Sequence, residues 1–358
     1  MAKDIFINRK AELAKLINGL KRINDFILIA PRRFGKTSLA FKVLDEIKLD
    51  KNIIVINLDI MSYSGGSIKS IAEGIIEKCL NTLGIMGKFR LLLKQIDFSF
   101  NLKMRYHDLE LEPIIQLFKD GDKEDEWKLL EEALQLPEKI AIREKKQVVM
   151  FFDEFGELSL MGERIIKLFR SVIQLHKHVS YLFAGSQETL MTKIFVDKSG
   201  AFYRFGELIY LHELTKEDVY TYIETAYPDI KLEVLLEVVN LTKCHPYYSA
   251  RILEHFADDK TYYMDISHFY EYVNTVLIPQ EHSYIELQLL KIKENIHALE
   301  VLRLIAMGLT PAHEFNLIAR QNLYKILHKL EAAGHIRKIA KSNYVLNDPL
   351  IEYYLTKY

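Results

Sequence analysis

One stretch near the amino terminus, FILIAPRRFGKTSLAF at 26–41, constrains the fold more than any other part of the sequence. Four apolar residues typical of a buried β-strand lead into a short basic loop, the loop ends in Gly-Lys-Thr, and a helical pattern follows. A strand, such a loop and a helix in this order form a phosphate-binding loop, in which backbone N–H groups and the helix amino terminus hold an anion. The stretch therefore predicts an α/β domain with a site for a nucleotide.

Each residue at the end of this loop has an expected task. Gly35 permits close approach of the backbone to phosphate, Lys36 is expected to reach the β- and γ-phosphates, and the Thr37 hydroxyl is expected to ligate Mg²⁺. The usual pattern has a glycine where this chain has Ala30. Alanine at that position indicates that the loop forms without the backbone freedom of glycine, and a basic loop that binds no nucleotide remains the alternative.

A second motif, QVVMFFDEF at 147–155, favours the nucleotide interpretation. It is an apolar strand that ends in two acids. Asp153 is expected to hold the Mg²⁺ shell, and Glu154 to orient or deprotonate the attacking water. A strand followed by two acids is commonplace by itself, but its occurrence after a phosphate-binding loop predicts a nucleoside-triphosphate site.

Short apolar runs alternate with helical patterns through the first two-thirds of the chain. They predict buried parallel strands in an open α/β sheet covered on both faces, at 26–29, 53–58, 148–152, 181–184 and 208–211. FSFNLKMRY at 98–106 alternates apolar and polar residues, which predicts a strand or hairpin inserted at the sheet edge. The charged stretch 119–128 is expected to be a solvated loop leading into a helix.

Beyond residue 211 the patterns become mostly helical. We expect three domains: a P-loop core over 1–212, a helical lid over 213–282 and a winged helix over 283–358. In the last of these, a helix, Gly334, a strand, a polar turn and a second strand follow one another.

Composition limits the cellular setting and the partners. The chain has 358 residues, is 49% apolar and carries a formal net charge of -1, so no global field attracts nucleic acid or an anionic membrane. Cys79 and Cys244 offer neither a disulfide framework nor metal-ligand spacing, and we expect buried free thiols. No run of 18 apolar residues occurs and MAKDIFINRK lacks a signal-peptide core, so a cytoplasmic protein without a membrane partner is expected.

The motifs together resemble the archaeal-type ATPases of the AAA+ superfamily, near the signal-transduction ATPases called STAND and the archaeal origin-initiator ATPases. The resemblance spans almost the whole chain. It is carried by IFINRKAEL (5–13), PRRFGKTSL (31–39), FFDEF (151–155), FAGSQETLM (183–191), FYRFGELIYLHELTKEDV (202–219), CHPYY (244–248) and YVLNDPLIEYYL (344–355).

The resemblance implies ATP and Mg²⁺ as cofactors and a larger set of site residues. Ser186 would be the sensor of the γ-phosphate or of the water, and Arg204 would sense the γ-phosphate in its own subunit or in a neighbour. The implied nucleotide contacts are Asn8 and Arg9 beside the adenine and ribose, Pro31, Arg32, Arg33, Phe34 and Ser38 in and after the loop, and His245 and Pro246 in a lid motif. In that motif Cys244 stands where the family has glycine.

Two outputs of the ATPase stay open. The first is a regulatory switch, in which the bound nucleotide positions the lid and the winged helix. The second is an initiator-like or mobile-element ATPase that binds duplex DNA through the basic residues Lys325, Lys329, Arg337 and Lys338. The winged helix could instead dock a protein, and a homo-oligomer is compatible with the sequence. A small-molecule kinase is disfavoured, because no lid arginine cluster or acceptor pocket is evident.

Overall fold

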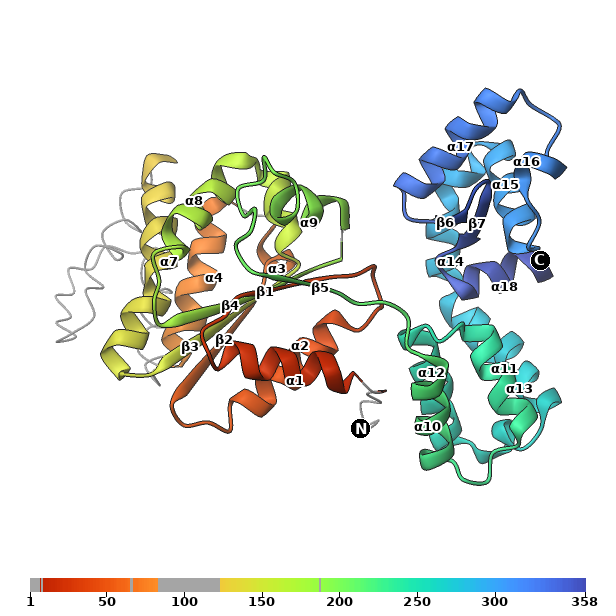
Figure 1. The fold of residues 1–358 in the computed structure, drawn as a ribbon, viewed down its shortest axis with the longest axis horizontal. Helices are drawn as coiled ribbons and strands as arrows, with labels where there is room; N and C mark the ends of the chain where they lie inside the picture. The colour runs from red at the N-terminus through yellow and green to blue at the C-terminus, as the bar shows by residue number, and fades with distance from the viewer. Residues whose placement is uncertain (1–6, 8, 65–66, 83–122, 187) are drawn as a thin grey trace, which may run out of the picture. The chain divides into compact units, whose positions relative to one another are not determined.

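The computed structural model describes residues 7, 9–64, 67–82, 123–186 and 188–358. Contacts between residues divide the chain into two compact units (Figure 1). The sheet unit is Arg9–His212, and the helical unit is Glu213–Tyr358 together with the amino-terminal residues up to Asn8, of which Ile7 is described. Each unit is considered by itself below.

The sheet unit is built on a five-stranded parallel sheet in the order β2-β3-β4-β1-β5. This confirms the predicted α/β class with a parallel sheet. Nearly all residues of β1, β3 and β4 are buried, as expected for strands that are covered on both faces. The strands are β1 (Phe26–Ile29), β2 (Ile53–Asp59), β3 (Gln147–Asp153), β4 (Val179–Gly185) and β5 (Glu207–Tyr210).

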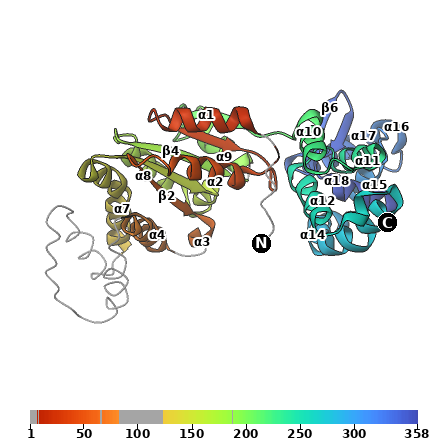
Figure 2. The ribbon, with the colours of Figure 1, turned by 90° about the horizontal axis from the view of Figure 1, so that it is seen from below.

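Helices pack on both faces of this sheet (Figures 1 and 2). One face carries α1 (Lys10–Leu20) and α2 (Lys36–Ile47), which also contact each other. The other face carries α4 (Ile68–Asn81), α7 (Lys123–Glu144), α8 (Glu163–Ile173) and α9 (Glu188–Phe195), while α3 (Met61–Ser64) and the 3-10 helix η1 (Phe155–Met161) follow the ends of β2 and β3. β3 alternates between these faces, because Phe151 contacts Phe41 of α2 whereas Phe152 contacts Phe169 of α8.

An aromatic cluster fills the core directly behind the end of β3. Phe155 is fully buried, and its ring centroid lies 4.7 Å from that of Phe183, 5.5 Å from Phe202 and 5.7 Å from Phe195. Edge-to-face and tilted ring pairs of this kind add stabilisation beyond the area they bury. The cluster fixes the chain at the residue that follows Glu154.

The helical unit has one continuous apolar core. Its first part comprises α10 (Lys216–Ala226), α11 (Leu232–Thr242), α12 (Pro246–Asp258), η2 (Lys260–Tyr263), α13 (Ile266–Tyr272), the π-helical η3 (Val273–Leu277) and α14 (Ile278–Lys293). Its second part comprises α15 (Ile296–Ala306), α16 (Pro311–Glu314), α17 (Arg320–Ala332), the antiparallel pair β6 (Ile336–Ala340) and β7 (Asn343–Leu346), and α18 (Pro349–Lys357). Thr215, Asp265, Asn295 and Asp348 each cap the helix that follows by accepting from its first-turn N–H groups.

Three predictions from the sequence can be compared with these element boundaries. The expected division at 282/283 falls inside α14, so the separation of a lid from a winged helix stays a prediction. The stretch 98–106, expected to be an edge strand or hairpin, and the beginning of the charged stretch at 119–122 lie outside the described residues. From Lys123 that charged stretch is already the first turn of α7 rather than a loop.

Two expectations on composition can also be compared with the structure. Cys79 and Cys244 are buried free thiols, as predicted. Within the described ranges, no helix has the length and apolar character needed to cross a bilayer.

Candidate nucleotide-binding site

The loop between β1 and α2 curls through two left-handed residues. Arg33 has φ 68° and Gly35 has φ 80°, whereas Ala30 has no positive φ. Ala30 is fully buried at the end of β1. Glycine is required only where the backbone enters the left-handed region or has no room for a Cβ, so alanine can stand at this position. Gly35 is the position where the conformation does favour glycine.

The amino end of α2 faces this loop. Gly35 is the N-cap of this 12-residue helix and has no side chain that could accept from the first-turn N–H groups. The side chain of Lys36 is buried, and its Nζ donates to the carbonyl oxygens of Ala30 at 2.8 Å and Pro31 at 2.9 Å. The helix dipole, the first-turn N–H groups and an ammonium therefore converge on the loop, which suits a polyphosphate.

The two predicted metal ligands, Thr37 and Asp153, are in direct contact. The Thr37 hydroxyl donates to Asp153 Oδ2 at 2.8 Å, although 116 residues separate them. Burial raises the pKa of Asp153, while hydrogen bonds from Thr37 and from the Glu154 N–H act in the opposite direction. A hydroxyl and a carboxylate side by side are oxygen donors that fit Mg²⁺, which keeps several waters and takes its other ligands from phosphates. These two residues could hold the metal without a larger protein cluster, and among the described residues no group of three or more His, Cys, Asp and Glu forms one.

Glu154 is held by Ser186. The backbone N–H and the hydroxyl of Ser186 both donate to Glu154 Oε2, at 2.9 and 2.8 Å. Ser186 is buried immediately after β4, and β4 lies between β1 and β3 in the sheet. The phosphate-binding loop, the two acids and Ser186 therefore gather at the carboxyl edge of three adjacent parallel strands, which is where open α/β sheets bind ligands.

The residues expected to contact the adenine, the ribose and the phosphates differ in their burial. Arg9 is buried, and its guanidinium donates to the backbone carbonyls of Phe34 and His212. Asn8 lies outside the described residues. Arg32, Thr37 and Ser38 are exposed, and Pro31, Arg33 and Gly35 are half-buried. The predicted contacts of these residues with nucleotide stay predictions.

Arg204 lies near the amino-terminal ends of the strands, at the end of the sheet opposite the phosphate-binding loop. β5 runs parallel to β1 with Glu207 beside Phe26, so the turn that precedes β5 is at the amino edge. Gly206 in that turn packs against the Asp25 backbone, where a Cβ would lie 2.7 Å from the Asp25 oxygen. Arg204 is exposed with φ 58°, and its guanidinium lies 5.3 Å from the Tyr203 ring centroid. This position does not support the alternative in which Arg204 acts on its own phosphate-binding loop, and action on a second copy stays a prediction.

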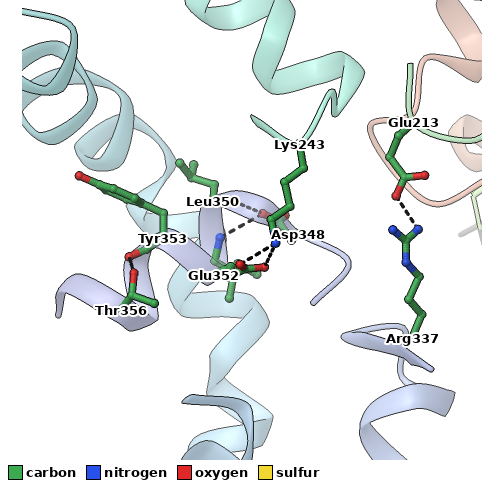
Figure 3. A network of polar contacts seen from close by, with 9 residues as sticks. Glu213, Lys243, Arg337, Asp348, Leu350, Glu352, Tyr353 and Thr356 are labelled. Carbon is green, nitrogen blue, oxygen red and sulfur yellow. Dashed lines mark hydrogen bonds and ion pairs between the residues drawn. The ribbon is translucent and has the colours of Figure 1, made fainter. Parts of the chain in front are cut away.

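The predicted lid motif begins α12 of the helical unit. Pro246 is the first residue of the helix, and His245 is its buried N-cap, with a ring centroid 4.8 Å from that of Tyr248. Cys244 has φ 60°, so it adopts the left-handed conformation that the family's glycine would take without strain. The preceding Lys243 binds Glu352 of α18 (Figure 3).

The four basic residues predicted to contact DNA are all exposed on α17 and β6. Arg337 is paired with Glu213 (Figure 3). Lys325 and Lys329 lie one turn apart on α17 and line a groove of about 630 Å³. The other lining residues are Asn295, His297, Ile318, Asn322, Tyr324, Ile326 and His328.

Comparison with solved structures gives the fold a precedent. A Walker-type ATPase of Pyrococcus abyssi superposes with a TM-score of 0.68 at 17% identity, covering 98% of this chain and 96% of the other. The chain has the fold of an AAA+ P-loop ATPase. Two Aeropyrum pernix proteins share this AAA+ fold: ORC1, solved in complex with DNA (TM-score 0.50, 12% identity, coverage 99% and 94%), and ORC2, solved in ADPNP-ADP complexes (TM-score 0.53, 14% identity, coverage 97% and 93%). No model of a protein family matches the sequence, and no curated protein matches it either.

Sequence reasoning missed two sets of contacts in this AAA+ fold. The carbonyls of Phe34 and His212 were not identified as partners of Arg9, and Glu213 was not identified as the partner of Arg337. A backbone carbonyl carries no sequence signal. Arg337 and Glu213 are 124 residues apart, so no periodicity relates them.

Proposed function

We propose that this chain binds ATP with Mg²⁺ and hydrolyses it slowly, and that the bound nucleotide sets the arrangement of the helical unit. The observation that carries the proposal is the hydrogen bond between Thr37 and Asp153, because it brings the oxygen donors of two motifs distant in sequence side by side. The fold shared with Walker-type ATPases supports the same function.

The residues divide the chemistry among them. The first turn of α2 and the Lys36 ammonium bind the β- and γ-phosphates, and Thr37 and Asp153 hold the cation. Mg²⁺, held by Thr37 and Asp153, would supply positive charge that neutralises the phosphates. Glu154, fixed by Ser186, orients a water and accepts its proton.

Titration calorimetry with MgATP and MgADP tests the binding step. The parental chain should release or absorb heat with both nucleotides, and Lys36→Ala should lose about 2–5 kcal/mol of binding free energy, because it removes a buried charge that faces phosphate. Lys42→Ala, an exposed lysine on the same helix, is the matched control and should bind as the parent does. Absence of heat in the parental chain would refute the proposal.

A second candidate function is duplex DNA binding by a winged helix formed from α15 to β7. The groove on α17 favours it, because Lys325 and Lys329 project from a helix that follows two others and precedes a β-hairpin, and Lys338 is exposed on that hairpin. The ORC1 neighbour was solved in complex with DNA, which supports this candidate by fold alone.

Salt-dependent DNA binding distinguishes this candidate from a purely internal switch. Changing Lys325, Lys329 and Lys338 together to Glu should weaken binding to any duplex and lower the slope of log K against log salt by about 3, one for each lost phosphate contact. Lys51, Lys69 and Lys193 of the sheet unit, changed to Glu together, provide a control of equal charge. Equal DNA affinity in the two triple variants would exclude α17 and β6 as the contact surface.

A further inference from the structure

Arg9 is a buried cation that binds two backbone carbonyls. The residue is 6% exposed, and a single amino group, Nη2, donates to the Phe34 carbonyl at 3.2 Å and to the His212 carbonyl at 2.7 Å. The other amino group, Nη1, lies 3.5 Å from Glu12 Oε1. A planar guanidinium with fixed donor directions holds its acceptors in a defined relative position.

Arg9 and its acceptor His212 stand at the two places where the chain passes between the units. The chain crosses once between Asn8 and Arg9 and again between His212 and Glu213. On the helical-unit side, the second residue from each crossing is buried in the apolar core; these residues are Ile7 and Leu214. On the sheet-unit side, one side chain therefore joins both crossings, and on the helical-unit side each crossing has an apolar anchor.

The Phe34 carbonyl connects the crossings to the phosphate-binding loop. The carbonyl of Phe34 belongs to the same planar peptide group as the N–H of Gly35. Any rotation that aims this N–H at a phosphate also rotates the carbonyl that Arg9 holds. Because Phe34 is buried, the peptide cannot turn without a response from its neighbours.

We propose that Arg9 couples the phosphate-binding loop to the two chain crossings, so that the phosphates bound at the loop bias the arrangement of the helical unit. This inference rests on the proposed nucleotide binding. It identifies Arg9 as the residue that transmits the effect of the bound phosphates to the helical unit. Coupling is reciprocal, so the arrangement of the helical unit equally changes nucleotide affinity. Arg9 acts here through the Phe34–Gly35 peptide and is a positioning residue.

A distance measurement between labelled cysteines on the full chain tests the coupling. Leu175→Cys and Leu232→Cys place one label in each unit at side chains that are 71% and 67% exposed, while the native Cys79 and Cys244 are buried. The label distance should differ between MgADP and a non-hydrolysable ATP analogue. Arg9→Met keeps an unbranched side chain without donors and, at saturating nucleotide, should remove at least about half of this difference. Arg22→Met, at an exposed arginine just after α1, should behave as the parent.

The outcomes separate this inference from the proposed function. A parental chain that binds no nucleotide by calorimetry refutes both. Nucleotide binding without a change in label distance, or an equal distance change in Arg9→Met, refutes the coupling alone. Hydrogen exchange on the unaltered chain covers the case in which Arg9→Met fails to fold or to bind nucleotide: amide exchange over 209–214 should differ between the two nucleotides, and identical exchange would refute the coupling.

Discussion

Glu154 adopts a left-handed backbone conformation, with φ 48° and ψ 41°, between a strand residue and a residue locked in the aromatic core. Asp153 is held by β3, and Phe155 is held by five surrounding rings. A non-glycine residue in this region carries strain that the surrounding packing must offset. In this conformation the Glu154 carboxylate accepts from Ser186, at the carboxyl ends of the strands where the phosphate-binding loop lies.

Substitution of Glu154 by glutamine tests its role as base. Glutamine can still accept from Ser186 but cannot take a proton, so Glu154→Gln should retain MgATP binding and reduce kcat by about 100- to 10,000-fold. Single-turnover hydrolysis and calorimetry on the same preparation measure both quantities. Glu163→Gln, an exposed glutamate at the start of α8, is the control, and parental turnover in Glu154→Gln would exclude Glu154 as the base.

At the scale of elements, Asp25 joins three strands at the amino edge of the sheet. Its carboxylate accepts from the Tyr181 N–H of β4 at 2.8 Å, and its carbonyl accepts from the Glu207 N–H of β5 at 2.9 Å, directly before β1 begins. Burial raises the pKa of Asp25 to about 6, against the opposing influence of the Tyr181 N–H and the Arg170 charge. The folded chain therefore binds a proton at Asp25 more tightly than the unfolded chain does.

This pKa predicts how stability depends on pH. The contribution of Asp25 to the free energy of unfolding is fully present below the unfolded pKa of about 4 and is lost as pH rises through about 6. Asp25→Asn, which resembles the protonated form, should be more stable than the parent by about 2–3 kcal/mol at pH 7.5 and by about half as much at pH 5. Urea unfolding at both pH values measures the difference, with Asp45→Asn on the surface of α2 as control. A difference that does not vary with pH would contradict the raised pKa.

Across the whole molecule, the residues proposed to hydrolyse ATP lie at both ends of the parallel strands. The carboxyl edge holds Lys36, Asp153 and Glu154, whereas Arg204 precedes β5 at the amino edge. A single parallel sheet cannot bring its two edges together. If Arg204 contributes to catalysis, it therefore does so on a second copy of the chain, in a heterologous contact between unlike surfaces.

Mixing two inactive variants tests this arrangement. Arg204→Ala should reduce ATP turnover by about 1,000-fold or more, the effect of losing an arginine that stabilises phosphoryl transfer. Lys36→Ala should be nearly inactive at ATP concentrations that just saturate the parent, because its ATP binding is weaker by about 2–5 kcal/mol. An equimolar mixture should recover up to about a quarter of parental turnover if the copies pair at random, because one contact in four then joins an intact Lys36 site to an intact Arg204. Turnover measured over a range of protein concentrations detects this recovery, and no recovery in mixtures that do associate would exclude action on a second copy.

Much of the sheet unit could be predicted from local patterns. All five strands lie where apolar runs were found. For β1, β3 and β4 the reason is burial on both faces, which excludes polar residues over most of the strand. Thr37 and Asp153 were predicted as neighbours because each follows a recognisable strand. The division of the helical unit was less predictable, since α14 and the shared apolar core run across the expected boundary.

By itself, the sequence determined the fold class, the phosphate-binding loop and the pair of acids, because each depends on residues close together in the chain. The tertiary structure alone decided that Arg9 binds carbonyls 25 and 203 residues away, that Ser186 holds Glu154, and that Arg204 lies at the edge opposite Lys36. Such contacts depend on strand order and on the directions of single side chains. Local hydrophobic periodicity contains neither.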